Sequence, residues 1–178
     1  MTAFATDTIA AIRRSERVDR IVVVLSAPYP DLAAQLTACD ATGVAPASFV
    51  LADNVEGLNE SIIAASGSVA APLAVFLGDL PSLTVADVSR TLIAADAVGR
   101  AVVPDAQGRG TVAIAATTGA LTPRFGAASL AAHLAAGYVR LAASERVRRD
   151  VDTLADLRAA LGLGVGAATA ALADRAGL

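Results

Sequence analysis

Lysine and tryptophan are absent from the 178 residues, and cysteine and histidine each occur once, at Cys39 and His133. Every cationic contact to a phosphate must therefore come from arginine, a backbone amide or a metal ion. One cysteine excludes an internal disulfide and fits a reducing compartment. No apolar run approaches the ~20 residues of a membrane span, and no basic-then-apolar leader precedes Ile21. We therefore expect a cytoplasmic protein that does not cross a membrane.

Charge and length narrow the class further. The formal net charge is -3, which argues against nucleic acid as the main partner because phosphate backbones are bound through clustered basic residues. The length fits one domain, residues 1–178. Hydrophobic residues make up 55% of the chain and many are alanine, so we expect helices packed closely on a sheet.

Short apolar runs alternate with amphipathic segments along the chain. The predicted strands are 21–26, 48–51, 73–77, 101–104, 112–115 and 139–142. The predicted helices are 2–14, 31–38, 60–66, 85–97, 129–136 and 154–161, with a short alanine-rich helix at the end. This alternation predicts an α/β fold with a mostly parallel sheet and right-handed crossovers. Strands 101–104 and 112–115 form a hairpin-like unit around a glycine-rich tip.

Local patterns predict the inward faces and the helix starts. The residues expected to face the core are Ile62 and Ile63 in one helix and Val88, Leu92 and Ile93 in another. Thr84 is expected to cap the helix that follows it. Thr153, with Asp156 three residues later, has the pattern of a capping box.

The stretch from Leu73 to Pro81 organises the chain. Its apolar run predicts a strand buried on both faces of a parallel sheet, and Asp79 follows where that strand ends. In parallel sheets ligands collect beyond the carboxyl ends of the strands. A carboxylate there suggests a cation site, because Mg²⁺ takes one or two carboxylates plus substrate phosphates. The alternative is that Asp79 only begins the turn before Pro81.

Several motifs, in order, resemble one protein family. They are Gly57-Leu58-Asn59, Gly78-Asp79-Leu80-Pro81, Pro104-Asp105 with Gly108-Arg109-Gly110-Thr111, Pro123-Arg124-Phe125-Gly126 with Ser129 and His133, and Asp150-Val151-Asp152-Thr153. The chain is similar to the 2-phospho-L-lactate guanylyltransferase (CofC/FbiD) family of coenzyme F-420 biosynthesis. The resemblance covers nearly the whole chain.

The resemblance implies a three-layer α/β/α sandwich of the nucleotidyltransferase (GT-A-like, Rossmann-like) type. It implies transfer of GMP from GTP to the phosphate of phosphoenolpyruvate or 2-phospho-L-lactate, with release of pyrophosphate. Asp79 and Asp152 would hold Mg²⁺ as catalytic residues, with Asp150 as a second candidate. Alternation along an extended segment puts Asp150 and Asp152 on one face, so both stay open. We favour Asp152, because it is nearer the strand end that precedes the Thr153 cap.

The chemistry of the reaction agrees with the composition of the chain. Transfer between two phosphates brings two anions together, so catalysis is largely positioning and neutralisation of charge. A phosphate nucleophile is already ionised near pH 7 and needs no general base. The lack of a Ser/His/Asp or Cys/His arrangement is therefore consistent with this interpretation.

For the acceptor acid, the resemblance implies contacts from Thr111, Gly126 and Ser129. Gly110 and Gly126 allow the backbone to approach an anion, and amides at the helix start near Ser129 are expected to point at negative charge. The glycine-rich segment is also compatible with an ordinary hairpin turn. Arg124 either pairs with a carboxylate or phosphate or lies in solvent.

For the nucleotide, the candidates are Gly57 and Asn59. Asn59 either contacts the ribose or guanine or has a role at a helix start. His133 fits a packing or capping residue better than a ligand. The arginine run at 146–149 either faces solvent or steers the triphosphate.

The chain departs from the family pattern at two places. Family members begin with an additional strand and a Pro-x-Lys nucleotide loop, which this sequence lacks. That strand lies in mid-sheet, so its absence exposes two strand edges. Either the start is placed too late or the chain is a shortened paralogue. Arg109 stands where the family commonly has a small residue, which leaves the acceptor open.

The sequence leaves three possible functions to be tested. The first is an active guanylyltransferase, and the second is a nucleotidyltransferase for another acceptor such as a molybdopterin. The third is a non-catalytic module that binds a phosphoacid but not GTP. Titration with GTP and Mg²⁺ separates the enzymes from the module.

Overall fold

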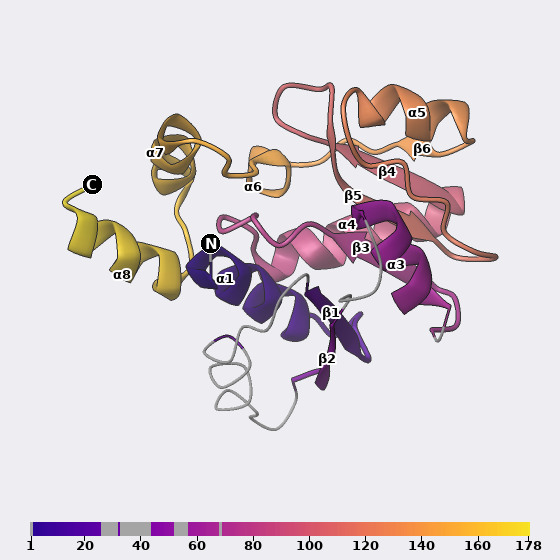
Figure 1. Ribbon diagram of the computed structural model, residues 1–178, viewed down its shortest axis with the longest axis horizontal. Coiled ribbons are helices and arrows are strands. Elements are labelled where there is room, and N and C mark those ends of the chain that lie inside the picture. The colour runs from indigo at the N-terminus through magenta and orange to yellow at the C-terminus, as the bar shows by residue number, and fades with distance from the viewer. Residues whose placement is uncertain (1, 26–31, 33–43, 52–56, 68) are drawn as a thin grey trace.

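The computed structural model describes all residues except 1, 26–31, 33–43, 52–56 and 68. Its elements are α1 (Thr2–Arg13), β1 (Ile21–Leu25), β2 (Ala47–Leu51), α3 (Leu58–Ser66), β3 (Leu73–Phe76), α4 (Val85–Val98), β4 (Arg100–Pro104), β5 (Thr111–Ala116), α5 (Ser129–Ala135), β6 (Val139–Arg140), α6 (Glu145–Arg148), α7 (Leu154–Leu163) and α8 (Ala167–Ala176) (Figure 1). The expected α/β fold is confirmed. The predicted helix at 31–38, except Leu32, and Cys39 lie outside the described residues.

The strands form a four-stranded sheet in the order β3-β5-β4-β6 and a two-stranded sheet of β1 and β2. The predicted hairpin is confirmed, because β4 and β5 pair antiparallel. β1 pairs parallel with β2, and β6 pairs parallel with β4. β3 was expected to lie in a parallel sheet, and this is wrong for its pairing, because its partner among the described strands is β5, in antiparallel register.

Helices cover both faces of the four-stranded sheet. On one face Val103 and Ala113 pack in a cluster with Val88 of α4. On the other face Val102 and Ile114 pack with residues of α5, which lies beside β4 in Figure 1. Because successive strand residues point to opposite faces, both clusters draw on the same strands. This gives the three layers of the expected sandwich.

The strands β1 and β3 are less buried than predicted. Every residue of both strands is half-buried, whereas β4 and β5 are almost completely buried. Within the part of the chain that the structure describes, β1 and β3 each pair with one strand only. A strand with one partner leaves backbone and side chains exposed along its open edge.

The capping predictions are confirmed, whereas the prediction that Ile63 and Ile93 face the core is wrong. The Thr84 and Thr153 side chains each accept a hydrogen bond from the third helical residue, which is an Asp whose carboxylate bonds back to the cap. Ile63 and Ile93 are 53% and 49% exposed, whereas Ile62 and Val88 are buried. Successive helical residues differ by ~100° around the axis, so these neighbours point elsewhere.

The segment after α5 is more helical than predicted. β6 ends at Arg140 rather than at Ala142. The charged passage that follows contains the short helix α6, which buries Val147. At the other end of the chain, α1 ends at Arg13, one residue before the predicted end of this helix.

The first and last helices are joined through a carboxylate. Asp7 of α1 accepts hydrogen bonds from the backbone N–H groups of Ala168 and Thr169 at 3.0 and 2.7 Å. These two residues lie in the first turn of α8, and α8 lies beside α1 in Figure 1. Among the described helices, none is long and apolar enough to cross a membrane.

Candidate active site

Asp79 lies in the turn that follows β3, and the backbone on both sides of it is held by one hydroxyl. Thr8 Oγ1 lies 3.3 Å from the Gly78 carbonyl oxygen and accepts a hydrogen bond from Leu80 N–H at 3.1 Å. The one proton of this hydroxyl is shared with a nearer acceptor, the carbonyl of Phe4 one turn earlier in α1 at 2.9 Å, so the contact with the Gly78 carbonyl is the weaker of the two. Because Thr8 is almost completely buried, α1 fixes the turn from within the core.

The Asp79 carboxyl group lacks the partners that a buried carboxylate normally has. Its Oδ1 atom is buried and has no hydrogen-bond partner among the described residues. The pKa of Asp79 is raised to about 6, mainly by burial and also by the charges of Asp150 and Asp152, against a lowering effect of its own backbone N–H. An orphaned anionic oxygen of this kind indicates a site for a positive charge.

The second acidic segment is tied directly to this turn. Val151 N–H donates to the Asp79 carbonyl oxygen at 3.1 Å, which places Asp150 and Asp152 on either side of the contact. Asp150 is half-buried, and its pKa is raised by burial and by the charges of Asp152 and Asp105. Asp152 is exposed. Asp152 was preferred to Asp150 because a strand was expected to end just before the Thr153 cap. That expectation is wrong, because helix α6 precedes this segment.

These carboxylates fit a hard cation that keeps part of its shell for other ligands. Among the described residues, no three His, Cys, Asp or Glu side chains are grouped so as to hold a metal ion by themselves. Mg²⁺ is commonly held by one or two carboxylates plus substrate phosphates. The unpartnered Oδ1 of Asp79 and the neighbouring acidic segment meet that requirement.

The glycine-rich tip between β4 and β5 is organised by its own carboxylate. Asp105 accepts from the N–H groups of Arg109 and Gly110 at 2.9 and 2.8 Å, and its own N–H donates to the Gly110 carbonyl. A Cβ at Gly110 would lie 2.5 Å from Asp105 Oδ2, so the close approach requires glycine. The Gly110 amide therefore binds Asp105 in this structure, which agrees with the hairpin-turn alternative.

This tip lies at the same sheet edge as Asp79. Leu77 N–H donates to the Val112 carbonyl at 2.9 Å, so the end of β3 lies beside the start of β5 and beside Thr111. Arg148 of α6 donates to the carbonyls of Asp105 and Ala106 at distances between 2.7 and 3.1 Å. The acidic segment, the hairpin tip and the Asp79 turn therefore share one edge.

The predicted acceptor residues come together around the start of α5. Leu130 N–H donates to the Arg109 carbonyl at 3.1 Å, which joins α5 to the hairpin tip. Thr111 and Ser129 are both buried, and Gly126 has φ 133°, a conformation that favours glycine. The structure thus brings Thr111 of β5 together with Gly126 and Ser129, which lie in the segment that leads into α5.

The amides at the start of α5 are not free in this structure. Ser129 N–H donates to the Gly126 carbonyl, and Leu130 N–H donates to the Arg109 carbonyl. The expectation that they point at a bound anion is therefore wrong for this structure. Their bonds instead hold the Gly126 and Arg109 segments against the helix.

Asn59 lies on the acceptor side of the edge. Its side-chain Nδ2 donates to the Phe125 carbonyl at 3.0 Å, and its Oδ1 accepts from Phe125 N–H at 2.7 Å. Gly57 is the N-cap of α3, with φ 97°, and it is exposed. The helix-start role therefore belongs to Gly57, while Asn59 clamps the backbone next to Gly126.

The arginines divide between structure and solvent. Arg124 is exposed, at the edge of the acceptor region. Arg146 donates to the Gly164 carbonyl at 3.2 Å, and Arg149 pairs with Glu145 at 2.6 Å. With Arg148 bound to the hairpin tip, the 146–149 run has protein partners and is not a purely solvated face.

Sequence analysis missed Thr8, the role of Asp105 and the contacts of His133. A threonine inside an amphipathic helix carries no signal for a bond to a turn 70 residues away. Asp105 had a local signal, because an Asp before Gly-x-Gly commonly bonds the amides of its own turn.

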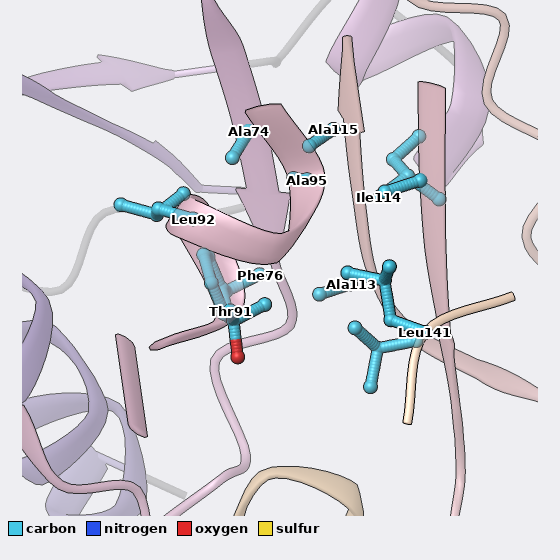
Figure 2. Close-up of a pocket in the computed structure, with 11 residues that line it drawn as sticks. Ala74, Phe76, Thr91, Leu92, Ala95, Ala113, Ile114, Ala115 and Leu141 are labelled. Atoms are coloured by element: carbon cyan, nitrogen blue, oxygen red, sulfur yellow. The ribbon is translucent and has the colours of Figure 1, made fainter. Parts of the chain in front are cut away.

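A small cavity lies elsewhere, between α4 and the sheet. Its lining includes Leu92 and Ala95 of α4 and Ala113 and Ala115 of β5, with the Thr91 hydroxyl as the polar group in view (Figure 2). The cavity has no charged lining residue, so it offers nothing to bind a nucleotide or a phosphoacid.

Comparisons with known proteins find several relatives that share one name. No protein-family model matches it. A phosphoenolpyruvate guanylyltransferase of Streptomyces scabiei is 41% identical over 97% of this chain and 82% of that relative. Proteins of the same name from Thermomonospora curvata and Mycobacterium marinum are 41% and 37% identical, over 97% and 94% of this chain and 76% and 77% of those relatives.

Proposed function

The chain belongs to the phosphoenolpyruvate guanylyltransferase family, and from this premise we propose that it transfers GMP from GTP to the phosphate of phosphoenolpyruvate. The membership confirms the family resemblance seen in the sequence. We extend the proposal to 2-phospho-L-lactate as an alternative acceptor, to Mg²⁺ as the cofactor and to coenzyme F-420 biosynthesis as the pathway.

The reaction exchanges one phosphoanhydride bond for another. An oxygen of the acceptor phosphate attacks the α-phosphorus of GTP, a new P–O–P bond forms, and the bond to the β-phosphate breaks with release of pyrophosphate. No proton has to be removed from the nucleophile, so the chain must supply position and charge balance. When bound, Mg²⁺ would neutralise the phosphate oxygens that approach each other.

One observation carries the proposal: the buried, unpartnered Oδ1 of Asp79 at a sheet edge shared with the acidic segment. In our proposal Asp79 and either Asp150 or Asp152 hold the cation. Thr8 and Val151 keep the Asp79 backbone in place through the bonds described above. The site is therefore preorganised before a substrate arrives.

The acceptor half is proposed at Thr111, Gly126 and Ser129, with Arg124 at its rim and Gly110 behind Thr111. The buried Thr111 and Ser129 offer hydroxyl donors to an anion, and the exposed Arg124 offers a guanidinium for a carboxylate or phosphate. For the nucleotide, Gly57 and Asn59 on α3 remain the proposed contacts. Asn59 would reach it with the hydrogen-bonding capacity that Phe125 leaves unused.

The test is a reaction of the protein with GTP, Mg²⁺ and phosphoenolpyruvate, in which pyrophosphate release is measured and the product is identified by mass. We expect a guanylylated acid that requires all three components, with no product from Asp79→Asn. Parallel reactions replace phosphoenolpyruvate by 2-phospho-L-lactate and GTP by ATP. Binding of phosphoenolpyruvate without binding of GTP would instead assign the chain as a phosphoacid-binding module.

A further inference from the structure

His133 is the one histidine of the chain, and its side chain is completely buried. It contacts three segments of the proposed acceptor site at once. Its Nε2 accepts from Arg124 N–H at 2.9 Å, and its Nδ1 lies 2.8 Å from the Ser129 carbonyl and 3.1 Å from Thr111 Oγ1. What exceeds the packing role expected from the sequence is that the partners of this one ring lie in separate segments of the proposed site.

The bonds determine the form of the ring. Because Nε2 accepts a backbone N–H, it carries no proton, and the proton of the neutral ring lies on Nδ1. Nδ1–H then donates to the Ser129 carbonyl, with Thr111 Oγ1 as the second neighbour. Burial lowers the pKa of His133, in agreement with a neutral ring that is a donor on one side and an acceptor on the other.

The segment 122–125 is held by side chains from α3, from α5 and from the connection between α5 and β6. Tyr138 Oη accepts from Thr122 N–H at 2.9 Å, His133 accepts from Arg124 N–H, and Asn59 accepts from Phe125 N–H. The His133 ring also packs edge-on against Phe125 and Tyr138, with ring centroids 5.3 Å apart in each pair. The segment is irregular, so these bonds replace the ladder that a strand or helix would provide.

We propose that His133 is a positioning residue that sets the geometry of the acceptor site, by fixing the Arg124–Gly126 backbone relative to Thr111 and Ser129. The proposal rests on the proposed function, because it assigns an effect on the acceptor acid. His133 does not touch the acid. It acts through the Arg124 amide, which orients the Arg124 side chain and the Gly126 turn, and through the Thr111 hydroxyl.

The experiment compares His133→Gln with His133→Asn. The Gln amide oxygen can reach the place of Nε2 and accept from Arg124 N–H, whereas the Asn amide reaches only the place of Nδ1 and leaves that N–H unpaired. We expect His133→Asn to raise the KM for phosphoenolpyruvate by about tenfold, the usual scale for an unpaired buried group, and His133→Gln by no more than about threefold. The KM for GTP should change by less than twofold in both.

Two further measurements keep the result free of folding effects. Val88→Ala, a buried change on α4 in the core cluster of the opposite sheet face, controls for general destabilisation and should leave the KM for phosphoenolpyruvate unchanged. Amide hydrogen exchange, measured without substrate, should quicken over 122–126 in His133→Asn and stay near the parent rate in His133→Gln.

The outcomes separate the two proposals. Equal rises in KM for both substrates, or unchanged exchange over 122–126 in His133→Asn, would overturn the positioning role and leave the proposed function standing. A parent protein that binds no phosphoenolpyruvate in calorimetry would overturn the acceptor site itself, and this proposal with it.

Discussion

The substitution Asp79→Asn tests the electrostatic state of the proposed metal site without any substrate. Asn has the same shape as Asp and cannot ionise. The pKa of Asp79 lies near 6 in the folded protein, against a model-peptide value of 3.8, because burial and two neighbouring carboxylates penalise its charge. The folded state therefore holds the proton more tightly than the unfolded state, and ionisation of Asp79 destabilises the fold.

The magnitude and its pH window follow from that difference. Two pKa units correspond to about 3 kcal/mol, and screening at a half-buried site lowers the expected cost to about 1 to 3 kcal/mol. Below pH ~4 Asp79 is protonated in both states and the cost vanishes. It grows as the pH rises from about 4 to 6 and is complete above that range, so Asp79→Asn should be more stable than the parent at pH 8 and equally stable at pH ~3.5.

The assay is thermal unfolding followed by circular dichroism. For a chain of this length we expect Asp79→Asn to raise the Tm at pH 8 by roughly 2 to 12 °C. Asp96→Asn, an exposed carboxylate on α4, is the matched control and should change little at any pH. Added Mg²⁺ with GTP should stabilise the parent and not the variant, since a ligand of the folded state shifts its Tm. A parent and variant with the same Tm at pH 8 would refute the account of an unpartnered buried carboxylate.

Three further variants test neighbouring contacts. Thr8→Val should raise the Mg²⁺ concentration for half-maximal activity by roughly fivefold or more, because the Leu80 N–H beside Asp79 loses its acceptor, whereas Thr8→Ser should stay near the parent; equal effects of the two would contradict the role of the hydroxyl. Asp7→Ala should lower the free energy of unfolding by about 1 to 2 kcal/mol in urea titrations, as for a lost helix cap, and an unchanged midpoint would show that α8 does not depend on this carboxylate. Ser129→Ala should weaken binding of phosphoenolpyruvate more than binding of GTP in calorimetry, and the reverse order would reassign the start of α5.

Much of the fold could be predicted because its signals are local. The Thr84 and Thr153 caps were recognisable from residues three positions apart, and the structure has both boxes. The hairpin between β4 and β5 was recognisable from its glycine-rich tip. Neither required knowledge of the rest of the chain.

What sequence analysis missed depends on contacts between distant segments. The antiparallel pairing of β3 with β5 joins residues about forty positions apart, and no local pattern specifies it. Ile93 was expected inside because it is apolar, but its direction on α4 leaves it in solvent. The short helix α6 was hidden by its charges, since only Val147 faces the core.

In the candidate site, too, the residues with a local signal were predicted, whereas contacts between distant segments were not. Asp79 was predicted from its place after an apolar run, and the structure adds the unpartnered oxygen on which the proposed cation site rests. The assignment of nucleotide contacts to Asn59 could not anticipate its bonds to Phe125, which lies 66 positions further along the chain. That Asp150 or Asp152 joins Asp79 in holding a cation stays a prediction.

The bonds between Asp7 and the first turn of α8 also affect when the turn that carries Asp79 is completed during synthesis. They join residues 161 and 162 positions apart, among the longest loops that this chain can close. Thr8, the next residue on α1, holds the Asp79 turn, and Gly166 N–H donates to Pro81 at the end of that turn. On the ribosome these contacts become available only after α8 has emerged, so the early part of the chain waits in an unfinished state. We therefore expect the Asp79 turn of a nascent chain to reach its final geometry as one of the last steps of folding, after the central sheet has formed.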